Sequence, residues 1–296
     1  MPKPGFFLVG APKCGTTSLH DHLAQHPALF LPAVKEPTFF GSDVPLVPAV
    51  GSLEAYVALF DAGEGRLCGE ASTNYLASTS AAREIHAFNP DARIIVALRN
   101  PVDFLPSYHM QQVFEGNEDL ADFAAALAAE PDRRAGRRLP PRCLHPAALR
   151  YREAATFSVQ LARWLDVFGR DAVHVVVFDD FVADAPAVMR ALYAFLGVSP
   201  DFAPVLGVKN PSMTVRSRLL QRVLTDPRLR RLGKRVIPEA VAARMGQAAV
   251  RLNARPEVRA PVPAALRAAL VREFRPEVRR LGELVGRELS RWSDPA

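Results

Sequence analysis

The sequence lacks several features that mark specialised classes of protein. Only three of its 296 residues are cysteines, and Cys14, Cys68 and Cys143 have neither the even number nor the density of a disulfide framework. No two of them have the spacing of a zinc site. No apolar run approaches the ~20 residues that a membrane-spanning helix needs, and the amino terminus shows no signal-peptide pattern. These absences predict a reduced, cytoplasmic protein.

The composition that remains is ordinary for a globular chain, with 49% hydrophobic and 23% charged residues. The formal net charge of +6 is compatible with phosphate, nucleic acid or an anionic membrane as a partner, but indicates none of them. Residues 215–296 hold 19 of the 37 Lys and Arg and 8 of the 31 Asp and Glu, a charge of +11. The other residues hold 18 basic and 23 acidic side chains, a charge of −5. The basic character therefore belongs to the carboxyl-terminal tail.

Short apolar segments alternate with segments of helical periodicity. Phe6–Gly10, Arg93–Leu98 and Ala172–Phe178 are rich in β-branched and aromatic residues, as buried strands are, and Leu67–Glu70 is a weaker fourth strand. This alternation predicts an α/β fold with a central parallel sheet flanked by helices. The expected helices are Thr16–His26, Leu53–Phe60, Ala81–Phe88, Val102–Phe114, Ala147–Phe168 and Ala185–Leu196.

We expect one domain over residues 1–296, with its core at about residues 5–200. Two segments fit the sheet poorly. Residues 130–146 are rich in arginine and proline and are expected to form a loop, and residues 201–296 are expected to be a basic, mostly helical extension. In parallel sheets, ligands bind where strands end. The loops of interest therefore follow Gly10, Glu70, Leu98 and Phe178.

The strongest local signal is the turn Gly10–Leu19, which follows a strand and opens a helix. Backbone N–H groups at a helix start, together with the helix dipole, form an anion site suited to phosphate. The spacing of Gly10 and Gly15 matches a nucleoside-triphosphatase P-loop, in which lysine follows the second glycine. Here Lys13 lies inside the loop instead. The residues expected around the phosphate are Lys13, Cys14, Gly15, Thr16, Thr17 and Ser18.

This turn resembles the 5′-phosphosulfate loop of sulfotransferases that use 3′-phosphoadenosine 5′-phosphosulfate (PAPS). A second motif distinguishes that family from nucleotide kinases. A strand ends at Arg99, Asn-Pro opens a helix, and Ser107 follows eight residues after the arginine. This resembles the family's element for the 3′-phosphate of PAPS, and the planar guanidinium of Arg99 suits a phosphate. The alternative for Arg99 is a helix-capping role beside Asp103.

The sequence departs from the family pattern just before Ser107. Phe104-Leu105-Pro106 stand where the family usually has Arg-Ala-Tyr. Proline within a helix removes a backbone hydrogen bond and can kink it. The position of Ser107 is therefore less firmly predicted than that of Arg99.

The segment Lys35-Glu36-Pro37-Thr38-Phe39-Phe40 resembles the Lys-Glu-x-x-Phe-Phe segment of heparan-sulfate-type and related bacterial sulfotransferases. The resemblance implies that Glu36 is the base for the acceptor hydroxyl. A carboxylate is too weak a base to ionise an alcohol beforehand, so proton removal must accompany attack on sulfur. Two alternatives stay open: Glu36 only pairs with Lys35 or caps a turn, or a histidine is the base, with His109 and His86 as candidates.

The resemblance also implies roles for further residues. Lys13 would stabilise charge on the leaving oxygen, and no metal is required. Arg216 and Arg218 fall where family members close a loop over the cofactor. The segment Gly69–Tyr75 resembles a strand end that lines the acceptor cleft, where Glu70 either holds the active-site lysine or is structural. The candidate substrate residues are Lys35, Glu70, Ser72 and His109, and Phe178–Phe181 is expected to be scaffold.

The resemblance thus implies a PAPS-dependent sulfotransferase that acts on a hydroxyl, or less readily an amine. Its acceptor would be a small molecule, carbohydrate or lipid, and a glutamate base favours carbohydrate or another aliphatic alcohol. The alternatives are a P-loop-type kinase or nucleoside triphosphatase and a non-catalytic nucleotide-binding protein. No nucleic-acid partner is expected, because the basic tail lacks interleaved aromatics. That tail would cover the cofactor, contact an anionic surface or only favour solubility.

Overall fold

The computed structural model describes residues 2–44, 49–141, 143–207, 213–215, 254–256 and 261–294. Residue contacts divide the chain into two compact units. The first unit comprises Met1–Phe104, Thr156–Lys209 and Ala269–Ala296, and the second comprises Leu105–Ala155 and Asn210–Ala268.

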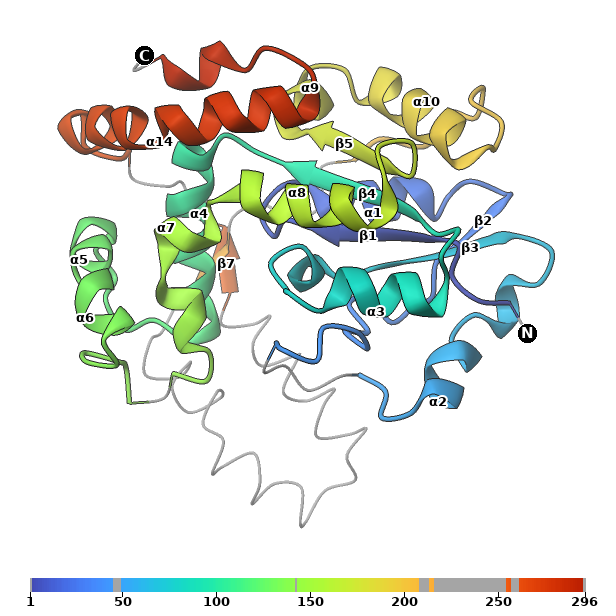
Figure 1. Cartoon of the computed structure of the whole chain (residues 1–296), viewed down its shortest axis with the longest axis horizontal. Coiled ribbons are helices and arrows are strands. Elements are labelled where there is room, and N and C mark those ends of the chain that lie inside the picture. Colours follow the sequence, from blue (N-terminus) through green and yellow to red (C-terminus); the bar gives the residue numbers. More distant parts are fainter. Residues whose placement is uncertain are drawn as a thin grey trace. The chain divides into compact units, whose positions relative to one another are not determined.

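A five-stranded parallel sheet with the order β2-β3-β1-β4-β5 forms the centre of the first unit (Figure 1). Every residue of β1 is buried, and so is every residue of β4 after its first. Strands covered on both faces have continuous apolar sequences, which is why these two segments are so apolar. The bounds are β1 Phe6–Gly10, β2 Leu29–Phe30, β3 Leu67–Ala71, β4 Arg93–Leu98 and β5 Val173–Val177.

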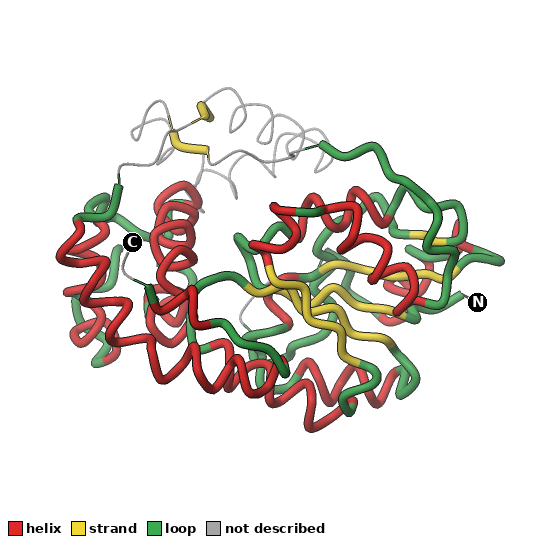
Figure 2. The backbone as a smooth tube through the Cα atoms, turned by 90° about the horizontal axis from the view of Figure 1, so that it is seen from above, coloured by secondary structure: helices red, strands yellow, loops and turns green. Residues whose placement is uncertain are grey.

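Helices lie on both sides of these strands (Figure 2). Helix α3 packs against α8, which also contacts β4 and β5, whereas α1 contacts β1 and α10 contacts β5. Asp184 caps α10 by accepting a hydrogen bond from the Ala187 N–H, and Gly197 ends that helix in the left-handed conformation. The bounds in this unit are α1 Thr16–Leu23, α2 Leu53–Ala58, η1 Asp61–Gly63, η2 Thr73–Tyr75, α3 Ala81–Phe88, α8 Phe157–Phe168, α9 Phe178–Ala183 and α10 Ala185–Leu196.

The end of the chain contributes α14 (Ala264–Val285) and η4 (Ser290–Ser293). The buried Glu277 of α14 accepts hydrogen bonds from both the N–H and the hydroxyl of Ser158, at 2.6 and 2.7 Å. Arg287 and Arg291 both form ion pairs with Asp180, so part of the basic tail is neutralised within the protein. Among the residues described, no helix has both the length and the apolarity needed to cross a membrane.

The second unit is helical, with a short antiparallel pair of strands. It contains a buried ion pair in which the Arg133 guanidinium donates to both oxygens of Glu118, at 2.5 and 2.6 Å. The Tyr151 hydroxyl and the Leu120 N–H also donate to Glu118. Helix α4 (Pro101–Glu115) crosses the unit boundary, and the other bounds are α5 Phe123–Ala128, α6 Glu130–Arg134, η3 Pro146–Leu149, α7 Tyr151–Ala154, β6 Met213–Val215 and β7 Ala254–Pro256.

The predicted α/β fold is confirmed, and two of its strands and two of its helices have the predicted bounds. The single helix expected over Ala147–Phe168 is wrong. The backbones of Arg150 (φ −96°, ψ 75°) and Thr156 (φ −83°, ψ 68°) leave the helical region and divide the segment into three. The two-residue strand β2 was not predicted, because so short a segment has no measurable periodicity.

The loop predicted for residues 130–146 is also wrong at its start, where α6 forms. Pro131 lies in the first turn of this helix, where its missing N–H removes no helical hydrogen bond. Arg133 faces the interior of the unit because Glu118 is there to pair with it. In the tail, β6 and β7 form two strands where mostly helix was expected.

Candidate active site

The loop between β1 and α1 lies at the carboxyl edge of the sheet. Gly15 is the N-cap of α1, has φ 81°, and leaves the helix without a side-chain cap. The first turn contains no acidic residue, and Lys13, two residues earlier, also has a left-handed backbone with φ 63°. The first N–H groups of a helix have no partners within it, and the helix dipole adds positive potential. This loop therefore has the donors and the charge to hold a phosphate.

Glycine is required at both ends of this loop for steric reasons. A Cβ atom on Gly10 would lie 2.5 Å from the carbonyl oxygen of Thr73, which follows β3. A Cβ atom on Gly15 would lie 3.1 Å from the ring of Phe178, which follows β5. The glycines thus allow the segments that follow β1, β3 and β5 to approach one another closely.

Arg99 follows β4 and is half-buried beside this loop. Its Nη1 donates to the carbonyl oxygen of Lys13 at 3.4 Å, and its guanidinium carbon lies 4.7 Å from the centre of the Phe178 ring. A guanidinium over an aromatic face is stabilised by the ring quadrupole. Phe178 is predicted above to be scaffold, but its ring also contacts Arg99. The sequence signal for this contact is weak, because it consists only of the position of Phe178 at the end of a predicted strand.

The side chains of the loop and of the first turn of α1 differ in exposure. Cys14 is buried, and this burial raises the pKa of its thiol to about 12, so the thiol is not ionised near neutral pH. Thr16 is buried and Thr17 is half-buried. The Thr17 hydroxyl oxygen accepts a hydrogen bond from Lys35 Nζ at 2.7 Å. The helix start is therefore connected directly to the segment that carries Glu36.

Glu36 lies on that segment, between β2 and α2, and its side chain is 35% exposed. Lys35 Nζ lies 3.6 Å from Glu36 Oε1, and the Thr73 hydroxyl donates to Oε2 at 3.2 Å. Glu36 thus forms an ion pair with Lys35. This pairing also places the carboxylate beside the lysine that contacts Thr17.

Glu70, near the end of β3, is only 1% exposed and is surrounded by hydroxyl groups. The hydroxyls of Tyr56 and Tyr75 donate to its Oε1 at 2.9 and 3.0 Å, and the Ser72 hydroxyl donates to its Oε2 at 2.7 Å. Burial outweighs these three bonds and raises the pKa of the Glu70 carboxyl from its usual 4.5 to about 7. Glu70 is thereby linked to the Glu36 segment, residues 35–40, because the Ser72 hydroxyl that donates to Glu70 also accepts a hydrogen bond from the Thr38 N–H at 3.1 Å.

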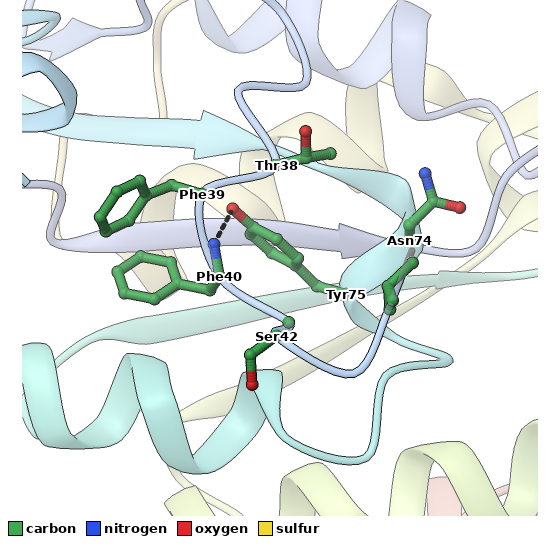
Figure 3. A pocket seen from close by; sticks show the side chains of 8 residues that line it. Thr38, Phe39, Phe40, Ser42, Asn74 and Tyr75 are labelled. Carbon is green, nitrogen blue, oxygen red and sulfur yellow. Dashed lines mark hydrogen bonds between the residues drawn. The ribbon is translucent and has the colours of Figure 1, made fainter. Parts of the chain in front are cut away.

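A cavity of about 310 Å³ opens beside the Glu36 segment (Figure 3). Among the described residues that line it, aromatic rings are combined with hydroxyl and amide groups, and none has a charged side chain. Thr38 is two residues from Glu36 in the chain, and Asn74 follows the Thr73 that bonds to Glu36. The cavity is lined by Thr38, Phe39, Phe40, Gly41, Ser42, Val44, Asn74 and Tyr75.

Comparisons with known proteins identify the family. Residues 53–204 match the sulfotransferase family. A crystal structure of a sulfotransferase from Alicyclobacillus acidocaldarius is 32% identical, with a TM-score of 0.70, and the match covers 99% of this chain and all of that one. The chain belongs to the sulfotransferase family. Membership of this family implies the use of PAPS.

Two curated relatives of this sulfotransferase are more distant. Human carbohydrate sulfotransferase 15 is 26% identical over 273 residues, which cover 72% of this chain and 47% of the relative. The bovine bifunctional heparan sulfate N-deacetylase/N-sulfotransferase 2 is 28% identical over 204 residues, which cover 67% of this chain and 22% of the relative. The sulfotransferase chain therefore spans half or less of the length of these two proteins.

Several of the predicted site residues of this sulfotransferase lie outside the first unit or outside the described residues. Ser107 and His109 belong to the second unit, in α4, which runs from Pro101 to Glu115 with Pro106 inside it. Both side chains are buried, and His109 Nε2 lies 2.8 Å from the Leu120 carbonyl oxygen, to which it donates. Burial also lowers the pKa of His109. Arg216 and Arg218 lie outside the described residues.

The histidine alternative His86 lies on α3, where its ring packs 5.3 Å from the ring of Phe168. The predicted site residues that do lie together are in the first unit of the sulfotransferase, where contacts connect Lys13, Thr17, Lys35, Glu36 and Arg99.

The raised pKa of Glu70 predicts a pH dependence of stability. Between about pH 4.5 and 7 the folded sulfotransferase retains a proton on Glu70 that the unfolded chain releases, so its free energy of unfolding falls as the pH rises through this range. Relative to the Glu70→Gln variant, the loss should approach roughly 3 kcal/mol. Urea unfolding of both proteins at pH 5 and pH 8 measures this loss. If the two proteins differed in free energy of unfolding by the same amount at both pH values, the raised pKa of Glu70 would be contradicted.

Proposed function

We propose that this sulfotransferase moves the sulfuryl group of PAPS to an acceptor hydroxyl, with Glu36 as general base and Lys13 stabilising the leaving phosphate. The observation that carries this proposal is the set of contacts around one loop. Arg99 donates to the Lys13 carbonyl on one side, and Lys35, adjacent to Glu36, donates to Thr17 on the other. A phosphate loop, a second cation and an accessible carboxylate are thereby held together.

The residues at this edge of the sheet fit the charge distribution of PAPS. The first-turn N–H groups of α1 and the Lys13 ammonium would hold the 5′-phosphosulfate, with loop residues Cys14 to Ser18 around it. Arg99 would hold the 3′-phosphate through charge-assisted hydrogen bonds. Ser107, Arg216 and Arg218 complete the proposed cofactor residues by family resemblance. When bound, PAPS supplies an activated sulfuryl group.

In the proposed reaction Glu36 accepts the acceptor's hydroxyl proton while the acceptor oxygen bonds to sulfur. The bond between sulfur and the bridging oxygen breaks, and the electron pair remains on the phosphate that leaves. Lys13 offsets the negative charge that develops there, as preorganised charge does in related group transfers. Thr73 and Lys35 would hold the Glu36 carboxylate in place through the contacts at 3.2 and 3.6 Å.

We propose a carbohydrate or another aliphatic alcohol as the acceptor. The cavity lined by Thr38 and the residues after it supports this choice, because aromatic rings with hydroxyl and amide groups suit a neutral hydroxylated ring. The name of carbohydrate sulfotransferase 15 points to a carbohydrate acceptor, whereas the name of the heparan sulfate N-deacetylase/N-sulfotransferase points to a carbohydrate that accepts on nitrogen.

The test of this function is transfer of ³⁵S from labelled PAPS to a panel of alkyl glycosides, aliphatic alcohols, phenols and amino sugars. We expect a labelled sulfate ester on an alcohol or glycoside, and the release of an equal amount of adenosine 3′,5′-bisphosphate. Labelled amino sugars with no labelled alcohols would contradict the hydroxyl assignment. No bisphosphate release above the protein-free rate, with water or any acceptor, would contradict the function.

Arg99 provides a prediction for cofactor binding. Arg99→Ala should weaken the binding of adenosine 3′,5′-bisphosphate by about 2–3 kcal/mol, roughly 30- to 150-fold, because charge-assisted hydrogen bonds to the 3′-phosphate are lost. Titration calorimetry measures this change. The matched control is Arg93→Ala at the amino end of the same strand, which should leave the affinity unchanged. An Arg99→Ala protein with wild-type affinity would exclude the 3′-phosphate role.

A further inference from the structure

The segment that carries Glu36 has an unusual backbone for its sequence. Glu36 and Thr38 both have left-handed φ values, 56° and 48°, although neither is glycine. Such conformations persist only where the surroundings impose them. The segment from Lys35 to Phe40 belongs to no helix or strand, so regular secondary structure does not impose them.

Three backbone N–H groups hold this segment to the end of β3 and the turn after it. Glu36 donates to the Ala71 carbonyl at 3.0 Å, and Thr38 donates to the Ser72 hydroxyl at 3.1 Å. Phe40 donates to the Tyr75 hydroxyl at 3.2 Å, the bond drawn in Figure 3. Two of the three groups that accept these bonds are therefore side-chain hydroxyls. Each hydroxyl can accept from the segment only when its own hydrogen points elsewhere.

Glu70 determines that orientation. A hydroxyl group has a single hydrogen to donate, and both Ser72 and Tyr75 donate theirs to Glu70, at 2.7 and 3.0 Å. Their lone pairs are then left to accept from Thr38 and Phe40. A third hydroxyl, that of Tyr56, donates to the same Glu70 oxygen as Tyr75, at 2.9 Å.

We propose that Glu70 is a positioning residue that holds the Glu36 segment in its catalytic conformation through Ser72 and Tyr75. This inference rests on the proposed role of Glu36 as base. Glu70 itself is buried among these hydroxyls and needs no contact with the reacting atoms. It acts on catalysis indirectly, because Ser72 and Tyr75 each donate to Glu70 and accept from the backbone N–H of Thr38 and Phe40.

The two tyrosines offer a matched pair of variants. Tyr56→Phe and Tyr75→Phe each remove one buried hydroxyl bond to Glu70 Oε1, but only Tyr75 also accepts from the segment. With water as the acceptor, we expect Tyr75→Phe to lower kcat for PAPS cleavage by about tenfold to 100-fold, the effect of a misplaced catalytic group. KM for PAPS should stay within about twofold, because the loop after β1 is untouched. Tyr56→Phe should change neither constant by more than about twofold.

A second pair of variants separates positioning from charge. In Glu70→Gln the amide oxygen can still accept from both tyrosines, and the amide nitrogen can donate to Ser72, whose other lone pair still accepts from Thr38. We therefore expect Glu70→Gln to retain most of kcat and Glu70→Ala to lose about tenfold or more. If Glu70→Gln were as slow as Glu70→Ala, a requirement for the carboxylate itself would replace the positioning role.

Hydrogen exchange provides a readout that does not depend on turnover. The amide exchange of residues 36–42, followed by mass spectrometry on the full chain, should accelerate in Tyr75→Phe and Glu70→Ala but not in Tyr56→Phe. Equal exchange and equal kcat in the two tyrosine variants would overturn the inference. If the wild-type protein cleaved no PAPS, the proposed function would fail, while the exchange comparison would still report whether Glu70 holds the segment.

Discussion

Replacing Glu36 by glutamine is expected to slow PAPS turnover by ~100-fold or more, the usual effect of removing a general base. Glutamine has nearly the same shape and can still accept a hydrogen bond from Thr73, but it cannot take a proton from the acceptor. The affinity for adenosine 3′,5′-bisphosphate should not change, because the phosphate loop and Arg99 do not depend on the Glu36 carboxylate. Initial rates and calorimetry on the same preparation measure both quantities.

The control for this experiment is Glu64→Gln, which removes an equivalent carboxylate at an exposed position of the first unit. It should turn over PAPS at the wild-type rate. A Glu36→Gln protein that matched this control would exclude Glu36 as the base. His86 and His109 would then have to be tested, although His109 Nε2 already donates to the Leu120 carbonyl.

Replacing Arg133 by alanine is expected to lower the free energy of unfolding by about 3–5 kcal/mol. The side chains of Arg133 and Glu118 are both fully buried, and each charge is compensated by the other. Removal of the arginine leaves the Glu118 carboxylate buried without its counter-ion, which is far more costly than losing a surface pair. Urea unfolding followed by circular dichroism measures the change.

Arg134, the next residue, is the matched control. Its side chain is 59% exposed and pairs with Glu153 at 2.7 Å, so Arg134→Ala should cost less than about 1 kcal/mol. Combining Arg133→Met with Glu118→Gln should recover part of the loss, because neither charge then remains buried alone. A loss no larger than that of Arg134→Ala would show that the buried pair does not stabilise the second unit.

The contrast between Arg133 and Arg134 shows what the sequence could not provide. Both belong to residues 130–146, an arginine-rich segment for which a loop is predicted. Whether an arginine is buried depends on a partner elsewhere in the chain, here Glu118, fifteen residues away. Local composition contains no information about that partner. The backbone breaks at Arg150 and Thr156 were missed for a similar reason, since the helical periodicity continues through them.

The site was more predictable where function depends on local chemistry. The turn around Lys13 and the position of Arg99 after a strand could be predicted from the sequence, because a strand–turn–helix unit is contiguous in the chain, and their phosphate-binding roles stay predictions. Phe178 beside Arg99 was not recognised as part of the site, since an aromatic at a strand end has no distinctive pattern. The hydroxyls around Glu70 were also missed, because Tyr56 belongs to α2 and is fourteen residues away.

The most direct test of the proposed PAPS site is a calorimetric comparison of adenosine 3′,5′-bisphosphate with ATP and Mg²⁺ on the wild-type protein. A PAPS site binds a 3′-phosphate, and ATP has no such group. The bisphosphate should therefore bind at least about tenfold more tightly than ATP, a difference of about 1.4 kcal/mol or more. Preference for ATP with Mg²⁺, or equal affinity for the two nucleotides, would contradict the proposed use of the loop after β1 and of Arg99.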